Sequence, residues 1–277
     1  MNLKSKTALA ALALIASTAA LAQAAAPVPD YTLAYNVGAV SQYRFRGMEQ
    51  TSGKPAIQGG VDFTHKSGAY LGAWASNVNW IKDFNGATQG DYEVDLYGGY
   101  KGEIVTGLGY DLGVITYQYP GNNSGAAGTP GFAAPAVYTN ANTTEFYVGL
   151  SYNIITAKYS QSLGDFLGNA NTNASRYFEI AANFDLGNGY TLTPHVGRQT
   201  IPNQVANGAL AAVADGTAAN YTDYSLTLAK DFGNGWSATI AAVGTDAKDR
   251  GFYQATSNGQ NRFLGSSTAV VGVKYSF

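Results

Sequence analysis

The sequence of 277 residues contains no cysteine, which excludes disulfide bonds, thiol nucleophiles and cysteine-ligated metals. It has only two histidines, His65 and His195, and two isolated histidines do not make a metal site. After the first 24 residues, no apolar run approaches the about 20 residues that a membrane-spanning helix needs. An α-helical membrane protein is therefore excluded.

Charge is scarce as well. Charged residues make up 12% of the chain, about half the usual share of a soluble domain, while the hydrophobic share of 45% is ordinary. The net charge of −2 argues against nucleic acid as a partner. Glycine and tyrosine are abundant instead, with 34 and 20 residues. A membrane β-barrel fits this composition, because it exposes an apolar band to lipid between two aromatic girdles, for which tyrosine is well suited.

The amino-terminal residues have the layout of a cleaved secretory signal. Lys4 and Lys6 precede an apolar core at 8–16, and small residues follow as far as Ala24. The apolar core is too short to cross a bilayer as a helix. We expect a signal peptide at 1–24, cleaved after Ala24, and then a short segment at 25–30 before the first strand.

Most of the remaining chain alternates between apolar and polar residues with the period of two that is typical of β-strands. In the first segment the odd positions from Tyr31 to Phe45 are mostly apolar or aromatic, so one face is expected to contact lipid and the other water. The third segment has no clean phase, and its orientation stays open. The predicted strands lie near 31–46, 57–64, 70–79, 92–100, 108–119, 145–154, 157–163, 176–184, 190–199, 221–230, 236–245 and 264–277.

The connections alternate between short turns and longer polar loops. Two of the turns, at 185–189 and 231–235, share the pattern Asp-x-Gly-Asn-Gly, which supplies the positive φ angles of a tight hairpin. Five short turns and six long loops suit an even-stranded barrel with both termini in the periplasm. We therefore predict an all-β fold: a closed antiparallel transmembrane β-barrel of about 12 strands over residues 31–277, with short periplasmic turns and longer extracellular loops.

The last predicted strand ends on an aromatic pair, Tyr275 and Phe277. This ending resembles the terminal signal of bacterial outer-membrane barrels, so we expect these two residues to act as a barrel-insertion signal. The expected partners are the barrel-assembly machinery and periplasmic chaperones during biogenesis, and outer-membrane lipid afterwards. The alternative is an amphipathic edge strand of a soluble β-sandwich.

Several motifs in the first half of the chain are similar to the TorF family of porins. The resemblance is carried by SQYRFRGMEQTSGKPAIQGGVD at 41–62, GAWASN at 72–77, DLYGGY at 95–100, YDLGVITYQYP at 110–120 and AKYS at 157–160. It implies an outer-membrane barrel of a Gram-negative bacterium with pore function, and it brings no catalytic residues.

The polar phase of each strand predicts which side chains line a pore. Arg44 and Arg46, at the end of the first strand, either form part of a constriction with acidic neighbours or pair with those acids and rigidify the wall. Glu93 and Asp95 have the spacing of an acid/base pair, but no nucleophile accompanies them. The predicted pore-lining residues are Arg44, Arg46, Asp62, Glu93, Asp95, Tyr97, Glu145, Tyr147, Lys158, Glu179, Asp223 and Lys274.

Three functions are compatible with these observations. The leading prediction is a channel for passive or weakly selective diffusion of small hydrophilic solutes, narrow and loop-gated because twelve strands fall between filled eight-stranded barrels and open porins. The second is a lipase-like outer-membrane enzyme with His195 as its base. The third is a structural or adhesin barrel with a filled lumen. Inward-pointing Tyr97 and Tyr147 also leave a sugar-stacking track open. We expect no enzyme activity and no cofactor, and the sequence does not indicate the oligomeric state.

Overall fold

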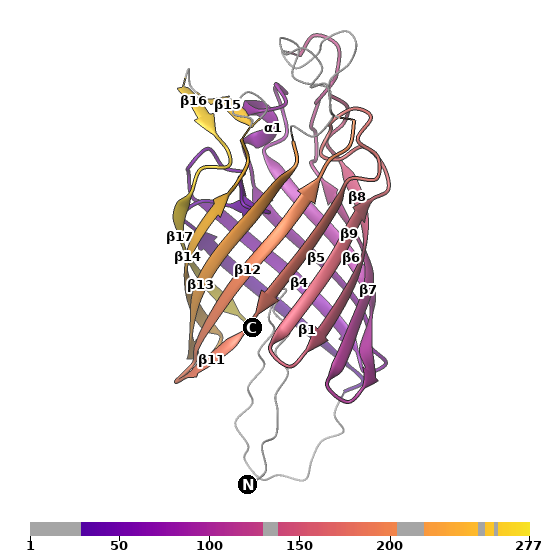
Figure 1. Ribbon diagram of the computed structural model, residues 1–277, viewed down its shortest axis with the longest axis vertical. Coiled ribbons are helices and arrows are strands. Elements are labelled where there is room, and N and C mark those ends of the chain that lie inside the picture. The colour runs from indigo at the N-terminus through magenta and orange to yellow at the C-terminus, as the bar shows by residue number, and fades with distance from the viewer. Residues whose placement is uncertain (1–28, 130–137, 204–218, 249–252, 258–259) are drawn as a thin grey trace.

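The chain forms a closed antiparallel β-barrel in the computed structural model, which describes residues 29–129, 138–203, 219–248, 253–257 and 260–277 (Figure 1). Thirteen strand segments form one sheet, and two of them, β10 and β11, make one interrupted strand because both pair with β12. The predicted all-β barrel of twelve strands is therefore confirmed. The wall consists of β1 (Tyr31–Val40), β4 (Ala56–His65), β5 (Ala69–Asn77), β6 (Tyr92–Val105), β7 (Leu108–Gln118), β8 (Thr143–Tyr152), β9 (Ile155–Ser162), β10 (Arg176–Ala182) with β11 (Phe184–Gly187), β12 (Tyr190–Thr200), β13 (Tyr221–Gly233), β14 (Trp236–Thr245) and β17 (Thr268–Ser276).

The ring closes where the first strand meets the last. β1 and β17 pair from Asn36 opposite Ser276 to Val40 opposite Gly272. The Phe277 amide donates to the Tyr35 carbonyl at 3.0 Å, and the Tyr35 amide donates back at 2.9 Å. No strand of the wall is left with an unpaired edge, which is how a barrel satisfies its backbone groups without water.

The connections divide the barrel into a turn end and a loop end. At the turn end, Asn188 and Gly189 have φ values of 52° and 76°, and Asn234 and Gly235 have 51° and 83°. These are the positive angles that the repeated Gly-Asn-Gly pattern predicts. At the loop end lie the elements outside the wall: β2 (Arg44–Phe45), β3 (Met48–Glu49), α1 (Trp80–Asp83), β15 (Gln254–Ser257) and β16 (Gln260–Phe263). None of the described helical residues belongs to a helix long and apolar enough to cross a membrane.

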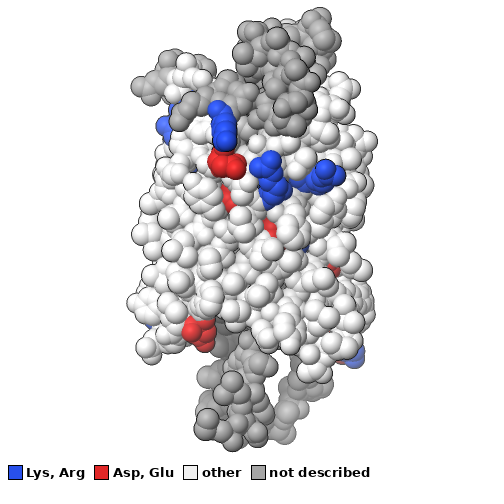
Figure 2. All heavy atoms as spheres, in the orientation of Figure 1, with Lys and Arg blue, Asp and Glu red and all other residues white. Residues whose placement is uncertain are grey.

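The outer face of the wall is apolar. Every strand of the wall exposes large hydrophobic side chains, and the face shown in Figure 2 is almost free of charge across its middle. Near the turn end the ring of Tyr35 stacks on that of Phe277 with centroids 5.7 Å apart, and Trp236 lies 4.9 Å from Tyr275. These rings form part of an aromatic belt of the kind that composition predicted.

The structure also settles the third strand, β5, whose phase the sequence left open. Leu71 points outward and is 63% exposed. Trp74 belongs to the inner face, because it pairs with Asp95 of β6 and Gly60 of β4. The phase was unclear because an aromatic residue takes an inward position.

The first strand is shorter than predicted. The alternation predicts a strand to Arg46, but β1 ends at Val40, after which the Ser41 amide donates to the Val271 carbonyl of β17 at 2.8 Å. The chain then turns through Arg46 and Gly47, which have φ values of 47° and 78°. Residues 41–51 form a small hairpin inside the barrel, named the inward hairpin below. The last strand is shorter too, since β17 begins at Thr268 rather than near residue 264.

Inner-face glycines accommodate tyrosine rings. A Cβ atom on Gly72 would lie 2.4 Å from two ring atoms of Tyr97, and one on Gly197 would lie 2.0 Å from the Tyr177 hydroxyl. Gly113 lies in the same way under Tyr147. The rings thus lie flat against the wall, which explains part of the joint excess of glycine and tyrosine.

This packing predicts that Gly72→Ala destabilises the barrel. The new methyl group meets the Tyr97 ring, which cannot swing away because its hydroxyl is held by Asp62 at 2.5 Å. Overpacking of this kind costs about 1–3 kcal/mol of the free energy of unfolding. Urea unfolding of the refolded barrel in lipid vesicles, followed by tryptophan fluorescence, measures the loss.

The matched control is Gly164→Ala, in a loop where no atom lies within 4 Å of the added Cβ. It should leave the urea midpoint unchanged. Equal midpoints for both variants would contradict the packing account.

Candidate functional site

The strand register brings most of the predicted pore-lining residues to the inner face. Residues that pair across neighbouring strands point to the same face of the sheet. One such row consists of Lys274, Gly38, Gln58, Ser76 and Glu93, and the pairing of the remaining strands continues the inner face around the ring. The predicted residues on this face are Asp62, Glu93, Asp95, Tyr97, Glu145, Tyr147, Lys158, Glu179, Asp223 and Lys274.

Arg44 and Arg46 are not part of the wall, contrary to the expectation that they end the first strand. Both belong to the inward hairpin. The Arg44 guanidinium donates to the backbone carbonyls of Gly47, Leu264 and Ser266 at 2.9–3.0 Å. Arg44 therefore joins the hairpin to the segment that precedes β17.

Arg46 reaches across the barrel. Its guanidinium makes two parallel hydrogen bonds to the Glu145 carboxylate on β8, at 3.1 and 2.6 Å, and a third, at 2.9 Å, to the side-chain oxygen of Gln199 on β12. The Arg46 and Glu145 side chains are 7% and 0% exposed. The guanidinium also lies 4.3 Å from the Tyr177 ring centroid and 4.8 Å from that of Phe45. A bidentate, buried arginine–carboxylate pair of this kind fixes geometry firmly.

A second anchor holds the hairpin against the opposite part of the wall. The Tyr43 hydroxyl donates to Glu93 on β6 at 2.9 Å, and its ring packs edge-on against Trp74 on β5 at 5.4 Å. Glu49 accepts three hydrogen bonds from Arg262 of β16, at 2.9–3.3 Å. The inward hairpin therefore contacts both sides of the lumen.

The described loops cover the hairpin. A cluster of buried apolar residues lies at the loop end, where Trp80 packs against Tyr119 at 5.3 Å and Phe84 against Tyr138 at 6.0 Å. The loop end of the lumen is thus packed with side chains. The cluster comprises Met48, Val78, Trp80, Ile81, Phe84, Ala87, Tyr117, Tyr119, Tyr138, Ala141, Phe166, Ile201, Ala219, Tyr221, Tyr253, Ala255 and Leu264.

His195 belongs to an ionic network on the inner face. Its Nε2 lies 3.1 Å from Glu179, which also pairs with Lys158 at 2.9 Å, and its Nδ1 lies 3.5 Å from Asp223. Tyr177 donates to Asp223 at 2.9 Å. Within the described part of the chain, no serine or threonine hydroxyl bonds to His195, so the contact that a lipase-like nucleophile requires is missing there.

Nearer the turn end, tyrosine hydroxyls meet carboxylates. Tyr97 donates to Asp62 and Tyr70 to Asp111, both at 2.5 Å, and Tyr70 also bonds to Tyr147. With their rings against Gly72 and Gly113, Tyr97 and Tyr147 do not project as a free stacking track. The described residues include no group of three or more His, Asp or Glu side chains that could hold a metal ion.

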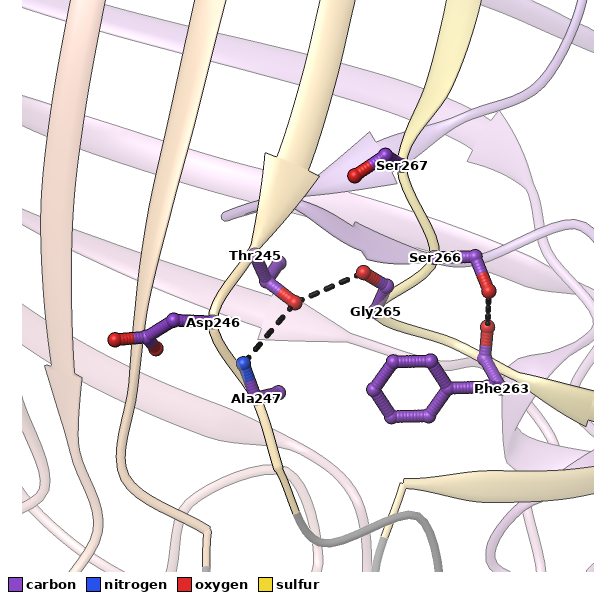
Figure 3. A pocket seen from close by; sticks show the side chains of 7 residues that line it. All are labelled: Thr245, Asp246, Ala247, Phe263, Gly265, Ser266 and Ser267. Atoms are coloured by element: carbon purple, nitrogen blue, oxygen red, sulfur yellow. Dashed lines mark hydrogen bonds between the residues drawn. The ribbon is translucent and has the colours of Figure 1, made fainter.

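A cavity of about 410 Å³ lies at the rim between β14 and β17, beside the inward hairpin, whose Arg44 donates to the carbonyl of its lining residue Ser266 (Figure 3). Its polar groups largely satisfy one another: Thr245 donates to the Gly265 carbonyl at 2.9 Å and Ser266 to that of Phe263 at 2.8 Å. No set of polar groups converges on a ligand position in this cavity.

The residues of the site that were not predicted include Tyr43, Tyr177 and Gln199. Tyr177 and Gln199 lie in the polar phase of their strands, so the alternation contained the signal for both. Tyr43 carried no such signal, because it falls in the apolar phase of the predicted first strand. In the structure that strand ends at Val40, before Tyr43.

Solved structures similar to the chain include the KdgM porin, with 8% identity, a TM-score of 0.49 and coverage of 88% of this chain and 99% of that one. The NanC porin has 12% identity, a TM-score of 0.49 and coverage of 89% and 99%. OccD3 of Pseudomonas aeruginosa has 12% identity, a TM-score of 0.40 and coverage of 91% and 66%.

No curated protein matches the chain. A family model described as "Bacterial protein of unknown function (Gcw_chp)" matches residues 22–277. Since this match covers nearly the whole chain, the protein belongs to the Gcw_chp family of bacterial proteins of unknown function.

Proposed function

We propose that this protein is a porin-like channel of the outer membrane, through which small hydrophilic solutes pass by passive or weakly selective diffusion. The observation that carries the proposal is the division of the wall into two faces. The outer face is apolar on every strand, and the charged residues of the strand centres point inward. Such a wall separates lipid from an aqueous interior.

The inward hairpin is the gate in this proposal. Its Arg46 joins β8 and β12 from inside the lumen, and its Tyr43 contacts β5 and β6. The structure then represents the closed state, in which hairpin and loops obstruct the loop end. In this proposal Arg46 takes both roles that the sequence suggests, since it lies at the constriction and pairs with Glu145 there.

The remaining assignments follow from this proposal. Residues 1–24 lie outside the described residues, and we propose that they are a cleaved secretory signal. The loop end then faces the exterior and the turn end the periplasm. The barrel-insertion role of Tyr275 and Phe277, the chaperones and the assembly machinery, and the relationship to TorF porins belong to the same proposal. A solute channel needs neither a catalytic residue nor a cofactor.

A structural barrel with a filled lumen is the second candidate. It is favoured by the burial of the Arg46–Glu145 pair and by the apolar cluster at the loop end. The two candidates differ in one respect, since only a gated channel opens when the contacts between the inward hairpin and the wall are weakened.

We predict that Arg46→Ala increases channel opening in a planar lipid bilayer. Charge-assisted hydrogen bonds contribute about 1.5–3 kcal/mol each, so removing them should raise the open fraction by about tenfold or more. Single-channel recording of wild-type and variant protein measures the change.

Arg198→Ala is the matched control, because this arginine lies outside the lumen and its side chain is 51% exposed. It should conduct as the wild type does. Absence of channel events from wild type and Arg46→Ala alike would favour the filled barrel.

We also predict where the protein resides and where it is cut. Expressed in full in a Gram-negative host, it should fractionate with the outer membrane and begin at Ala25. Membrane fractionation followed by mass spectrometry of the intact chain tests both points. A full-length chain in the cytosol would contradict the proposed signal and location.

A further inference from the structure

The charged residues of the inner face fall into two sectors. In the sector from β8 to β13, acids have basic partners: Glu145 pairs with Arg46, Glu179 with Lys158, and Asp223 with His195. In the sector from β4 to β6, Asp62, Glu93 and Asp95 have no Lys, Arg or His within 4.0 Å among the described residues. One side of the lumen therefore carries acidic side chains that no basic side chain balances.

Two of these carboxylates are buried. Glu93 is 1% exposed and Asp95 is 7% exposed. Glu93 accepts a hydrogen bond from the Tyr43 hydroxyl, but the Oδ1 atom of Asp95 has no hydrogen-bond partner. A buried carboxylate without partners is unfavourable, so the position lacks a donor that a ligand would supply.

Aromatic rings surround this acidic pair. Asp95 is flanked in the sheet by Trp74 on β5 and by Tyr117 on β7, and Tyr43 packs against Trp74 from the inward hairpin. Carboxylates beside aromatic faces suit the positive end of an organic cation, which gains both a charge-assisted hydrogen bond and a cation–π contact. A small metal ion would instead require a shell of oxygen ligands.

We propose that Glu93 and Asp95 form a subsite for the ammonium or guanidinium group of an organic cation. This inference rests on the proposed channel function and names its solute class, small cationic amines. In the closed structure the Tyr43 hydroxyl takes one donor position on Glu93. An arriving N–H donor competes with Tyr43 for Glu93, and it satisfies the free Asp95 oxygen as well.

The test compares a cation and an anion of matched size, butylammonium and butyrate. Each is added to single wild-type channels in KCl, and each is titrated calorimetrically into the barrel in a neutral maltoside detergent. Butylammonium should interrupt the potassium current and release or absorb measurable heat, and butyrate should do neither.

The double variant Glu93→Gln/Asp95→Asn should require at least about tenfold more butylammonium for the same block and heat, since it loses both charges. Asp246→Asn is the matched control, because this carboxylate lies outside the lumen with its side chain 50% exposed. Tyr43→Phe keeps the ring but frees Glu93 from its hydroxyl donor, and it should bind butylammonium more tightly than wild type. Heat-dependent gel mobility verifies that each variant is a folded barrel.

The outcomes separate the two proposals. Channels that open but bind butylammonium equally in wild type and double variant overturn the subsite and leave the channel intact. Calorimetric binding that is lost in the double variant, from a barrel that never conducts, supports the subsite and overturns the channel. Equal effects of butylammonium and butyrate overturn the subsite.

Discussion

The structure depends on closure of the sheet. The strands of the wall pair with their neighbours around the ring, and the pairing of β1 with β17 leaves no edge. Closure has a direct consequence for the side chains, because successive residues then point to opposite sides of a continuous wall. The apolar phase must lie outside and the polar phase inside around the whole ring, since a slip of one residue in any strand would exchange the two.

Inside the barrel, the polar side chains make two kinds of contact. Tyrosines lie over inner-face glycines, and their hydroxyls bind carboxylates, as Tyr97 does with Asp62. The inward hairpin adds longer-range bonds, of which the Arg46–Glu145 pair is the most deeply buried. The paired sector and the acidic sector face the same lumen, so the interior carries an uneven charge distribution. This asymmetry is the basis for the solute class that we propose.

Local pattern predicted the barrel well, because strand alternation and Gly-Asn-Gly turns are properties of neighbouring residues. The inner-face positions of Glu93 and Lys158 followed from phase alone. The inward hairpin did not follow, since the alternation continues to Arg46, whose partners Glu145 and Gln199 lie 99 and 153 positions along the chain. The phase of β5 was hidden because Trp74 faces inward over Gly60. A short helix such as α1 and the β15–β16 pair depend on loop packing, which no periodicity records.

The central claim is that the inward hairpin obstructs a lumen that otherwise conducts. The chain has no cysteine, so a single introduced pair can test it. Phe45 and Tyr117 lie with ring centroids 5.3 Å apart, one on the hairpin and one on the wall. Single-channel current from the Phe45→Cys/Tyr117→Cys barrel, cross-linked with a reducible bis-methanethiosulfonate reagent and then reduced in the same bilayer, is the most direct measurement. The account predicts no current while the cross-link is intact and channel openings after reduction; equal currents in both states would contradict it.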